Sequence, residues 1–307
     1  MPSSAELAVI VCSRERSEML RDALATITRF TPADASILVV DSASTTFGTR
    51  DAARDAGVDY VRTDVKGLSI ARNLGLAASD RAYLLYTDDD CVAIEGWISG
   101  ILSHFSDPRV GAVTGEMIDP LDPPPGGAGL RRFDTIVGGL DAGHGALMAF
   151  RRDVLDDLGG FDEVLGAGRH MAGAEDLDIF CRILDAGWTI VYDPACVVHH
   201  VHTRDDGAYE TLYLGYGRGL GGMVGKWLRT RPLTGLRLLA VLAGRNLRRI
   251  RRLRNDPRRG PAERAMLRGI GQGITETRGI RIEHGRFVDP DRPEPIVLTA
   301  VAHEEGI

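Results

Sequence analysis

Three consecutive aspartates have the residue types of a metal site. Asp88, Asp89 and Asp90 directly follow residues 82–87 (AYLLYT), a short apolar run typical of a buried strand. Adjacent carboxylates repel one another and lose hydration on burial, so they require a strong positive counter-charge. A hard divalent cation supplies it, since carboxylate oxygens are the ligands that Mg²⁺ and Mn²⁺ prefer. A solvated acidic turn is the alternative, but the position directly after a buried strand favours the metal site.

A carboxylate pair and a histidine cluster lie further along the chain. Glu175 and Asp176 begin a predicted helix, where the helix dipole favours negative charge, so on its own the pair fits an ordinary helix start. His199, His200 and His202 follow a predicted strand. Imidazole can complete an oxygen-ligated Mn²⁺ site, although the cluster alone would also fit a pH-sensitive surface patch or an adventitious metal site.

Alternating strand and helix patterns predict the elements that position these residues. Short β-branched runs indicate buried strands, and apolar residues at helical spacing indicate helices. The predicted strands are residues 7–12, 36–40, 82–87, 110–115, 146–150 and 188–192, and the predicted helices are residues 17–30, 68–79, 94–105 and 175–186. This order predicts an α/β fold with a doubly wound, Rossmann-like, mostly parallel sheet. Ligands of such sheets bind at the carboxyl ends of the strands, where Ser13, Glu15 and Asp41 also lie.

Composition and missing motifs exclude several classes of protein. The 307 residues are 44% hydrophobic and 26% charged, which excludes a disordered, collagen-like or coiled-coil chain. The chain has no GxGxxG after the first strand and no GxxxxGK[ST], which argues against a dinucleotide oxidoreductase and a phosphate-loop NTPase. Its four cysteines are widely spaced and are expected to be buried free thiols. With neither a signal-peptide pattern nor a long uncharged apolar run, we expect a cytoplasmic protein.

The basic residues are concentrated near the C-terminus. Twelve of the 37 Lys and Arg residues lie between Lys226 and Arg259, although the chain as a whole has a net charge of −6. Residues 236–255, read as a helix, mix a Leu, Val and Ile stripe with arginines, which suits peripheral contact with an anionic membrane surface at its inner face. A structural helix and a homodimer contact are the alternatives. Nucleic acid is disfavoured because aromatic residues are nearly absent among the basic ones.

The order of these motifs resembles glycosyltransferase family 2, whose members have the GT-A fold. The resemblance covers about residues 7–226 and is carried by a turn after the first strand, a VVD strand end, a GxSxARN helix, the aspartate run, a GGFDE segment, an ED pair and a late histidine. These are residues 12–16, 39–41, 67–73, 87–90, 159–163, 175–176 and His200. Each motif is unspecific alone, and their shared order carries the resemblance.

The resemblance implies an inverting glycosyltransferase of the hexosyltransferase type. It would move a sugar from a nucleoside-diphosphate sugar, UDP-linked, to the hydroxyl of a glycan, a lipid-linked acceptor or a small molecule, with Mn²⁺ or Mg²⁺ as cofactor. A nucleotidyltransferase or another metal-dependent nucleotide enzyme remains an alternative, as does a non-catalytic nucleotide-sugar-binding protein.

The resemblance also assigns roles to individual residues. The nucleoside pocket would contain Ser13, Glu15, Asp41 and Arg72, with Asp88 and Asp89 facing the ribose and the metal surroundings. Asp90 and His200 would bind the cation. Asp176 would be the catalytic base, with Glu175 assisting it or taking that role. Glu15 and Leu147 depart from the family pattern, which has Asn at both positions.

Composition and motifs together predict three parts of the chain. We expect a GT-A catalytic domain over residues 1–205, with a nucleotide-sugar half over about 1–115 and an acceptor half over about 116–205. A Pro- and Gly-rich loop at residues 120–129 lies near the join. A basic helical extension over residues 206–280 and a tail over residues 281–307 would follow.

Overall fold

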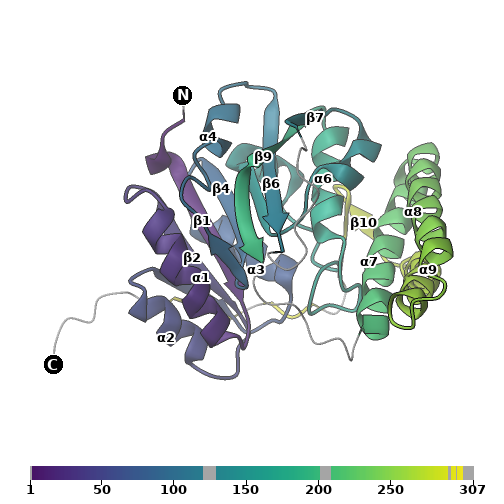
Figure 1. The fold of residues 1–307 in the computed structure, drawn as a ribbon, viewed down its shortest axis with the longest axis horizontal. Coiled ribbons are helices and arrows are strands. Elements are labelled where there is room, and N and C mark those ends of the chain that lie inside the picture. The colour runs from purple at the N-terminus through teal and green to yellow at the C-terminus, as the bar shows by residue number, and fades with distance from the viewer. Residues whose placement is uncertain (1, 120–128, 201–208, 290–291, 295, 300–307) are drawn as a thin grey trace.

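The structure is a computed structural model of the 307-residue chain and describes residues 2–119, 129–200, 209–289, 292–294 and 296–299. A central sheet has helices on both faces (Figure 1). The strands are β1 Leu7–Ser13, β2 Ser36–Ser42, β3 Asp59–Thr63, β4 Tyr83–Asp88, β5 Cys91–Ala93, β6 Val110–Ile118, β7 Arg131–Phe133, β8 Leu147–Arg151, β9 Thr189–His200, β10 Ile282–Glu283, β11 Arg286–Phe287 and β12 Val297–Thr299. The helices are α1 Ser17–Phe30, α2 Gly48–Asp55, α3 Leu68–Ala78, α4 Ile101–His104, α5 Arg152–Leu158, α6 Glu175–Asp185, α7 Tyr209–Thr230, α8 Pro232–Arg252 and α9 Arg259–Glu276, with 3₁₀ turns at Ser4–Glu6 and Ile136–Asp141.

The sheet combines a parallel half with a mixed half. Its strand order is β12-β3-β2-β1-β4-β8-β6-β9-β5, and β7 also pairs with β9. The strands β3, β2, β1 and β4 run parallel, whereas β8 is antiparallel to both of its neighbours, β4 and β6. The strands β6 and β9 are parallel to each other. The predicted α/β fold is therefore confirmed.

Each face of the sheet is covered by amphipathic helices. Leu20, Ala23, Leu24 and Ile27 lie along one side of α1, and all four are buried against the sheet. Helix α2 packs on the same face, while α3, α5 and α6 cover the opposite face. Figure 1 shows the sheet between α1 and α2 on one side and α6 on the other. These helices pack on the two faces of the sheet and not on the carboxyl ends of its parallel strands.

Two predicted elements differ in extent from the structure. The predicted helix over residues 94–105 is mostly turns, and only α4 at its end is helical. Gly96 adopts a left-handed conformation with φ 78°, which interrupts a helix, and the apolar pattern arises because Trp97 and Ile98 are buried against the sheet. The predicted strand at residues 188–192 continues to His200, past a register shift against β6.

Helices α7, α8 and α9 form a layer beyond α6 (Figure 1). Met223 and Trp227 of α7 and Leu238 of α8 share an apolar core with Leu165 and with Phe287 of the β10–β11 hairpin. The tail then returns to the sheet edge, where β12 pairs with β3. This core contains residues from both sides of the predicted boundary at residue 205. The boundary itself lies outside the described residues and stays a prediction. Within the described ranges, no helix has the length and apolar character required to span a bilayer.

Glycines bring α7 and α9 into backbone contact. A Cβ at Gly273 would lie 2.2 Å from the carbonyl oxygen of Arg218, whereas a Cβ at Gly271 would meet nothing within 4 Å. We expect Gly273→Ala to lower the free energy of unfolding by about 1–3 kcal/mol through overpacking. Gly271→Ala, two residues away in the same helix, should raise it by up to about 1 kcal/mol. Denaturant unfolding of both variants checks this, and equal effects would contradict the close packing.

Candidate active site

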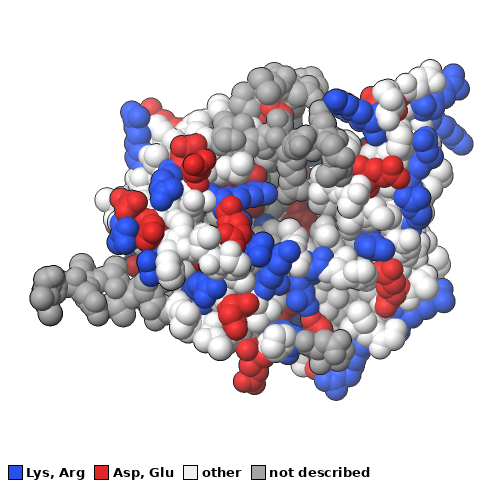
Figure 2. Space-filling view, turned by 90° about the horizontal axis from the view of Figure 1, so that it is seen from below, with Lys and Arg blue, Asp and Glu red and all other residues white. Residues whose placement is uncertain are grey.

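Strand pairing brings predicted site residues to one edge of the sheet. Ser13 pairs with Asp41 between β1 and β2, and Cys12 pairs with Asp88 between β1 and β4. Figure 2 views the molecule from below, the side toward which β6 and β9 point in Figure 1, and acidic and basic side chains intermix there. The face of the molecule on this side therefore presents charges of both signs.

Asp89 and Asp90 contact a basic residue to which the sequence analysis assigned no role. The Nη1 atom of Arg16 lies 2.9 Å from Asp89 Oδ1 and 3.1 Å from Asp90 Oδ2. The Ser13 hydroxyl donates a hydrogen bond of 2.7 Å to Asp89 Oδ2. Arg16 lies in the turn directly after β1, and its position in that turn is the signal that would have indicated it.

Asp89 and Asp90 are buried and Asp88 is half-buried, which has an electrostatic cost. Burial raises the pKa of Asp88, and the nearby Arg72 partly opposes this shift. Burial also raises the pKa of Asp89, where Arg16 has the opposing effect. A cation bound between these carboxylates would stabilise their charged forms further. The electrostatics therefore fit a cation site.

Asp88 and Asp90 also have the geometry of a divalent-cation site. Candidate ligand atoms of Asp88, Asp90 and Cys91 lie within 4.8 Å of one another. Strand β9 places His200 opposite Cys91, and His200 Nε2 is 3.5 Å from Asp90 Oδ2. Burial raises the pKa of the Cys91 thiol, which keeps it neutral and a poor ligand. Two carboxylates and one imidazole remain, a set that suits Mn²⁺ or Mg²⁺.

Of the two predicted histidines that lie within the described residues, His200 contacts the aspartate run. The hydrogen bond to Asp90 raises the pKa of His200. His199, next to it in β9, pairs with Val92 and Ile118, so its side chain lies on the other face of the strand. His202 lies outside the described residues. The structure thus brings Asp90 and His200 together, and their role as metal ligands stays a prediction.

A first cavity, of about 200 Å³, lies between the aspartate run and a group of basic residues. Its lining comprises Cys12, Ser13, Arg14, Arg16, Ser42, Lys66, Gly67, Leu68, Asp88, Asp89, Asp90, Ala167 and Gly168. The cations Arg14, Arg16 and Lys66 can pair with phosphate oxygens, while the aspartates can hold a metal ion. The first cavity therefore fits a diphosphate together with a divalent cation.

Asp41 and Glu15 lie outside the lining of the first cavity. Asp41 is buried, and its two oxygens accept hydrogen bonds from the Ser44 amide at 2.8 Å and the Tyr60 hydroxyl at 2.9 Å. Glu15 has a left-handed backbone with φ 56°, and its exposed carboxylate accepts bonds from the amide and hydroxyl of Thr45. Those bonds lower the pKa of Glu15. The predicted place of both residues in the nucleoside pocket stays a prediction.

Arg72 connects the aspartate run to the ED pair. It is buried, with Nη1 3.0 Å from Glu175 Oε1 and Nη2 3.6 Å from Asp88 Oδ1. Its backbone carbonyl accepts a hydrogen bond from the hydroxyl of Tyr86. The guanidinium of Arg72 thus lies between two carboxylates, and its predicted place in the nucleoside pocket stays a prediction.

Glu175 and Asp176 have different surroundings at the start of α6. Glu175 is buried, and burial raises the pKa of its carboxyl while Arg72 opposes the shift. Asp176 is half-buried, and its oxygens accept hydrogen bonds from the amides of Gly145 at 3.0 Å and Leu177 at 2.8 Å. Backbone donors thus orient Asp176, while an ion pair holds Glu175.

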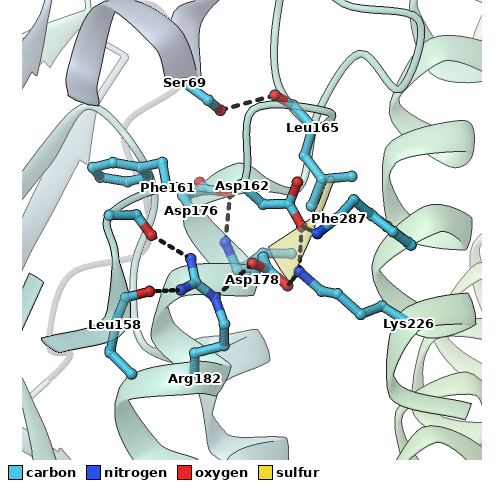
Figure 3. A network of polar contacts seen from close by, with 12 residues as sticks. Ser69, Leu158, Phe161, Asp162, Leu165, Asp176, Asp178, Arg182, Lys226 and Phe287 are labelled. Carbon is cyan, nitrogen blue, oxygen red and sulfur yellow. Dashed lines mark hydrogen bonds and ion pairs between the residues drawn. The ribbon is translucent and has the colours of Figure 1, made fainter. Parts of the chain in front are cut away.

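A buried charge network fixes α6 just below this pair (Figure 3). Asp178 makes ion pairs with Arg182 at 2.9 Å and with Lys226 of α7 at 2.8 Å. Lys226 also pairs at 2.5 Å with Asp162, which lies in the GGFDE segment and accepts a hydrogen bond from the amide of Phe287. Two carboxylates balance two cations, so the network is neutral and joins α6, α7 and the C-terminal hairpin.

A second cavity, of about 340 Å³, opens at the ED pair. Its lining comprises Leu68, Arg72, Asp88, Gly145, Ala167, Ala172, Gly173, Ala174, Glu175, Asp176, Leu177, Tyr216, Leu220 and Met266. Leu68, Asp88 and Ala167 line both cavities, so the two adjoin at these residues. The arrangement can hold a charged donor on one side and an acceptor beside Asp176 on the other.

His144 is a further residue that sequence reasoning missed. Burial lowers the pKa of its imidazole, while Asp176 and Asp88 oppose that shift. Its buried Nδ1 has no hydrogen-bond partner among the described residues. Only its position two residues before the predicted strand at 146–150 could have drawn attention to it.

Comparison with known proteins connects this geometry to a family. The model of "Glycosyl transferase family 2" matches residues 8–159, and that of "Glycosyltransferase like family 2" matches residues 131–214. The pre-mycofactocin glycosyltransferase of Mycobacterium tuberculosis is 29% identical over 224 residues, covering 61% of this chain and 46% of that protein. Glycosyltransferase AglE of Haloferax volcanii is 26% identical, covering 51% of this chain and 53% of that protein. The chain spans about half the length of these curated relatives.

Solved structures share the fold. The mannosyltransferase PcManGT from Pyrobaculum calidifontis, in complex with GDP-Man and Mn²⁺, has a TM-score of 0.64 and 20% identity, covering 88% of this chain and 87% of that one. GalNAc-T7 with UDP, GalNAc and Mn²⁺ has a TM-score of 0.54 and 17% identity, covering 74% and 50%. By its family matches across residues 8–214 and by this shared architecture, the chain belongs to glycosyltransferase family 2 and has the GT-A fold.

Proposed function

We propose that this protein is a metal-dependent, inverting glycosyltransferase that moves a sugar from a nucleoside-diphosphate sugar to an acceptor hydroxyl. The observation that carries the proposal is the pair of adjoining cavities that share Asp88. The lining of one contains aspartates and basic residues, and the lining of the other contains Asp176. The anomeric carbon would lie near their junction, between the leaving diphosphate and the acceptor.

The donor side would bind the diphosphate through Arg14, Arg16 and Lys66. Asp90 and His200, with Asp88 beside them, would hold the divalent cation. When bound, the cation would neutralise the charge that develops on the leaving diphosphate. The PcManGT and GalNAc-T7 structures hold Mn²⁺ with GDP-Man or with UDP, which supports a cation and leaves both nucleotides to be tested beside the predicted UDP.

We assign the catalytic base to Asp176 rather than to Glu175. The charge of Glu175 is engaged by Arg72 at 3.0 Å, whereas the described contacts of Asp176 are with backbone amides, which orient a carboxylate without neutralising it. Asp176 would take the proton from the acceptor hydroxyl as that oxygen attacks the anomeric carbon. Attack from the side opposite the leaving group inverts the anomeric configuration.

The test is product analysis with a panel of UDP- and GDP-linked sugars in Mn²⁺. Glycosyl transfer, or the slow hydrolysis that accompanies it, releases nucleoside diphosphate. A nucleotidyltransferase would instead transfer the nucleoside monophosphate group and release sugar 1-phosphate, and a phosphodiesterase would release nucleoside monophosphate together with sugar 1-phosphate. A binding protein without catalysis would retain its nucleotide sugar intact. Any of these three outcomes would reject the proposal.

We further propose that α8 contacts an anionic membrane surface. Leu233, Leu236 and Leu247 are 74%, 55% and 44% exposed on this helix. Arg248 is exposed beside Leu247 and lines a hollow with other arginines of the same helix. Figure 2 shows Lys and Arg side chains along the edge of the molecule where α8 and α9 lie. Exposed leucines beside arginines suit a surface that is anionic and apolar beneath.

We expect the protein to float with vesicles of phosphatidylcholine and phosphatidylglycerol in equal parts, and not with phosphatidylcholine alone. The variant L247S/R248E/R251E should lose this binding, because it removes both the apolar and the basic contacts. Arg21→Glu, an exposed charge change on α1, is the matched control. Binding that is unaffected by the triple change would contradict the proposal, and light scattering would then test the homodimer contact.

A further inference from the structure

The second cavity has two chemically different sides. Its charged lining residues, Arg72, Asp88, Glu175 and Asp176, belong to the α/β body. The helical layer contributes Tyr216 and Leu220 from α7 and Met266 from α9. The lining also includes side chains of Leu68, Ala167, Ala172, Ala174 and Leu177. The carboxylates therefore face a wall that is largely apolar.

Three side chains of the helical layer define that apolar wall. Tyr216 and Leu220 are four residues apart on α7, so they lie on one face of the helix. Both are half-buried, as is Met266. A Cβ at Gly217 would lie 2.2 Å from the carbonyl oxygen of Met266, which shows how closely α9 approaches α7 at this wall.

Helix α7 packs closely against the segment that precedes Glu175. A Cβ at Gly219 would lie 2.3 Å from the carbonyl oxygen of Gly173, so α7 lies directly on the segment that precedes Glu175. Further along α7, Lys226 makes its buried ion pair with Asp178 of α6. Because these contacts already hold the wall in place, an apolar group can bind to it with little loss of side-chain or loop entropy.

We propose that the second cavity takes an acceptor whose reactive hydroxyl is attached to an apolar or aromatic body, and that Tyr216, Leu220 and Met266 hold that body. The inference rests on the proposed function, because it assigns the hydroxyl to Asp176. A chain of free sugars would place many hydroxyls against Leu220 and Met266, which offer them no hydrogen bonds. An alkyl or aryl group would instead be removed from water there.

The experiment compares two probes with one sugar and different apolar parts, methyl β-glucoside and octyl β-glucoside. Binding is measured by titration calorimetry with Mn²⁺ and saturating nucleoside diphosphate, below the micelle concentration of the octyl compound. We expect the octyl compound to bind at least tenfold more tightly, because its added methylenes are buried. Tyr216→Ala and Leu220→Ala should each remove most of this difference, whereas Tyr216→Phe should keep it.

Tyr209→Ala provides the matched control. Tyr209 stacks on Tyr213 of the same helix but does not line the second cavity, so this variant should keep the preference for the octyl compound. Equal binding of the two glucosides to the unmodified protein would overturn the inference, as would a preference that survives in both Tyr216→Ala and Leu220→Ala. Nucleotide binding and donor turnover are measured separately, and their absence would reject the proposed function instead.

Discussion

Asp176→Asn is expected to lower the kcat of sugar transfer by about 10²–10⁴-fold, the usual effect of removing a positioned general base. Nucleotide affinity should stay close to that of the unmodified protein, because Asp176 lies outside the lining of the first cavity. Asparagine keeps the shape of the side chain, and its oxygen can still accept a hydrogen bond from one backbone amide. It cannot accept the proton of the acceptor. The measurement is transfer rate together with nucleotide affinity.

Glu175→Gln is the informative comparison for that result. The change removes the charge that Arg72 pairs with but leaves Asp176 in place. We expect a smaller loss of kcat, accompanied by a change in the KM of the acceptor. An inactive Glu175→Gln variant beside an active Asp176→Asn variant would reverse the two roles. If both variants remained active, Glu175 and Asp176 would form only the N-terminal turn of α6, and neither would be the catalytic base.

Asp90→Ala is expected to abolish cation-dependent turnover of the donor. Asp90 lies where the candidate metal ligands converge, next to His200, so its loss removes a principal anionic ligand. Calorimetric titration of Mn²⁺ into the nucleotide-bound protein should show affinity at least tenfold weaker. Asp55→Ala, which removes an exposed carboxylate of α2, is the control. Unchanged Mn²⁺ affinity, or full turnover in the presence of a chelator, would refute the metal assignment.

Strands β1, β2 and β4 of the parallel half could be predicted because they are short, largely apolar runs that are mostly buried. The strand β3 and the helix α2 were not predicted, because DYVRT and GTRDAARD mix polar residues into patterns without clear periodicity. The predicted helix over residues 94–105 was largely wrong because buried side chains of irregular turns can imitate a helical pattern. Local patterns therefore succeed where burial is uniform along an element.

The sequence identified many residues of the candidate site through their motifs. It did not predict which of these residues contact one another. The sequence indicated Arg72 and Glu175 separately, yet their ion pair joins residues 103 positions apart. Arg16 was quoted within a motif, but its contact with Asp89 depends on how α1 follows β1. The apolar wall of the second cavity arises from helices whose packing no single pattern specifies. Such long-range contacts require the three-dimensional structure.

The central claim is that the reaction occurs at the anomeric carbon and leaves the phosphates intact. The most direct test is donor hydrolysis in water enriched in oxygen-18, followed by mass spectrometry of both products. Attack at the anomeric carbon breaks the bond between that carbon and the bridging oxygen, so the heavy isotope should appear in the released sugar and be absent from the nucleoside diphosphate. Heavy oxygen in a phosphate group of the nucleotide or of the sugar would show attack at phosphorus and would contradict the proposed function.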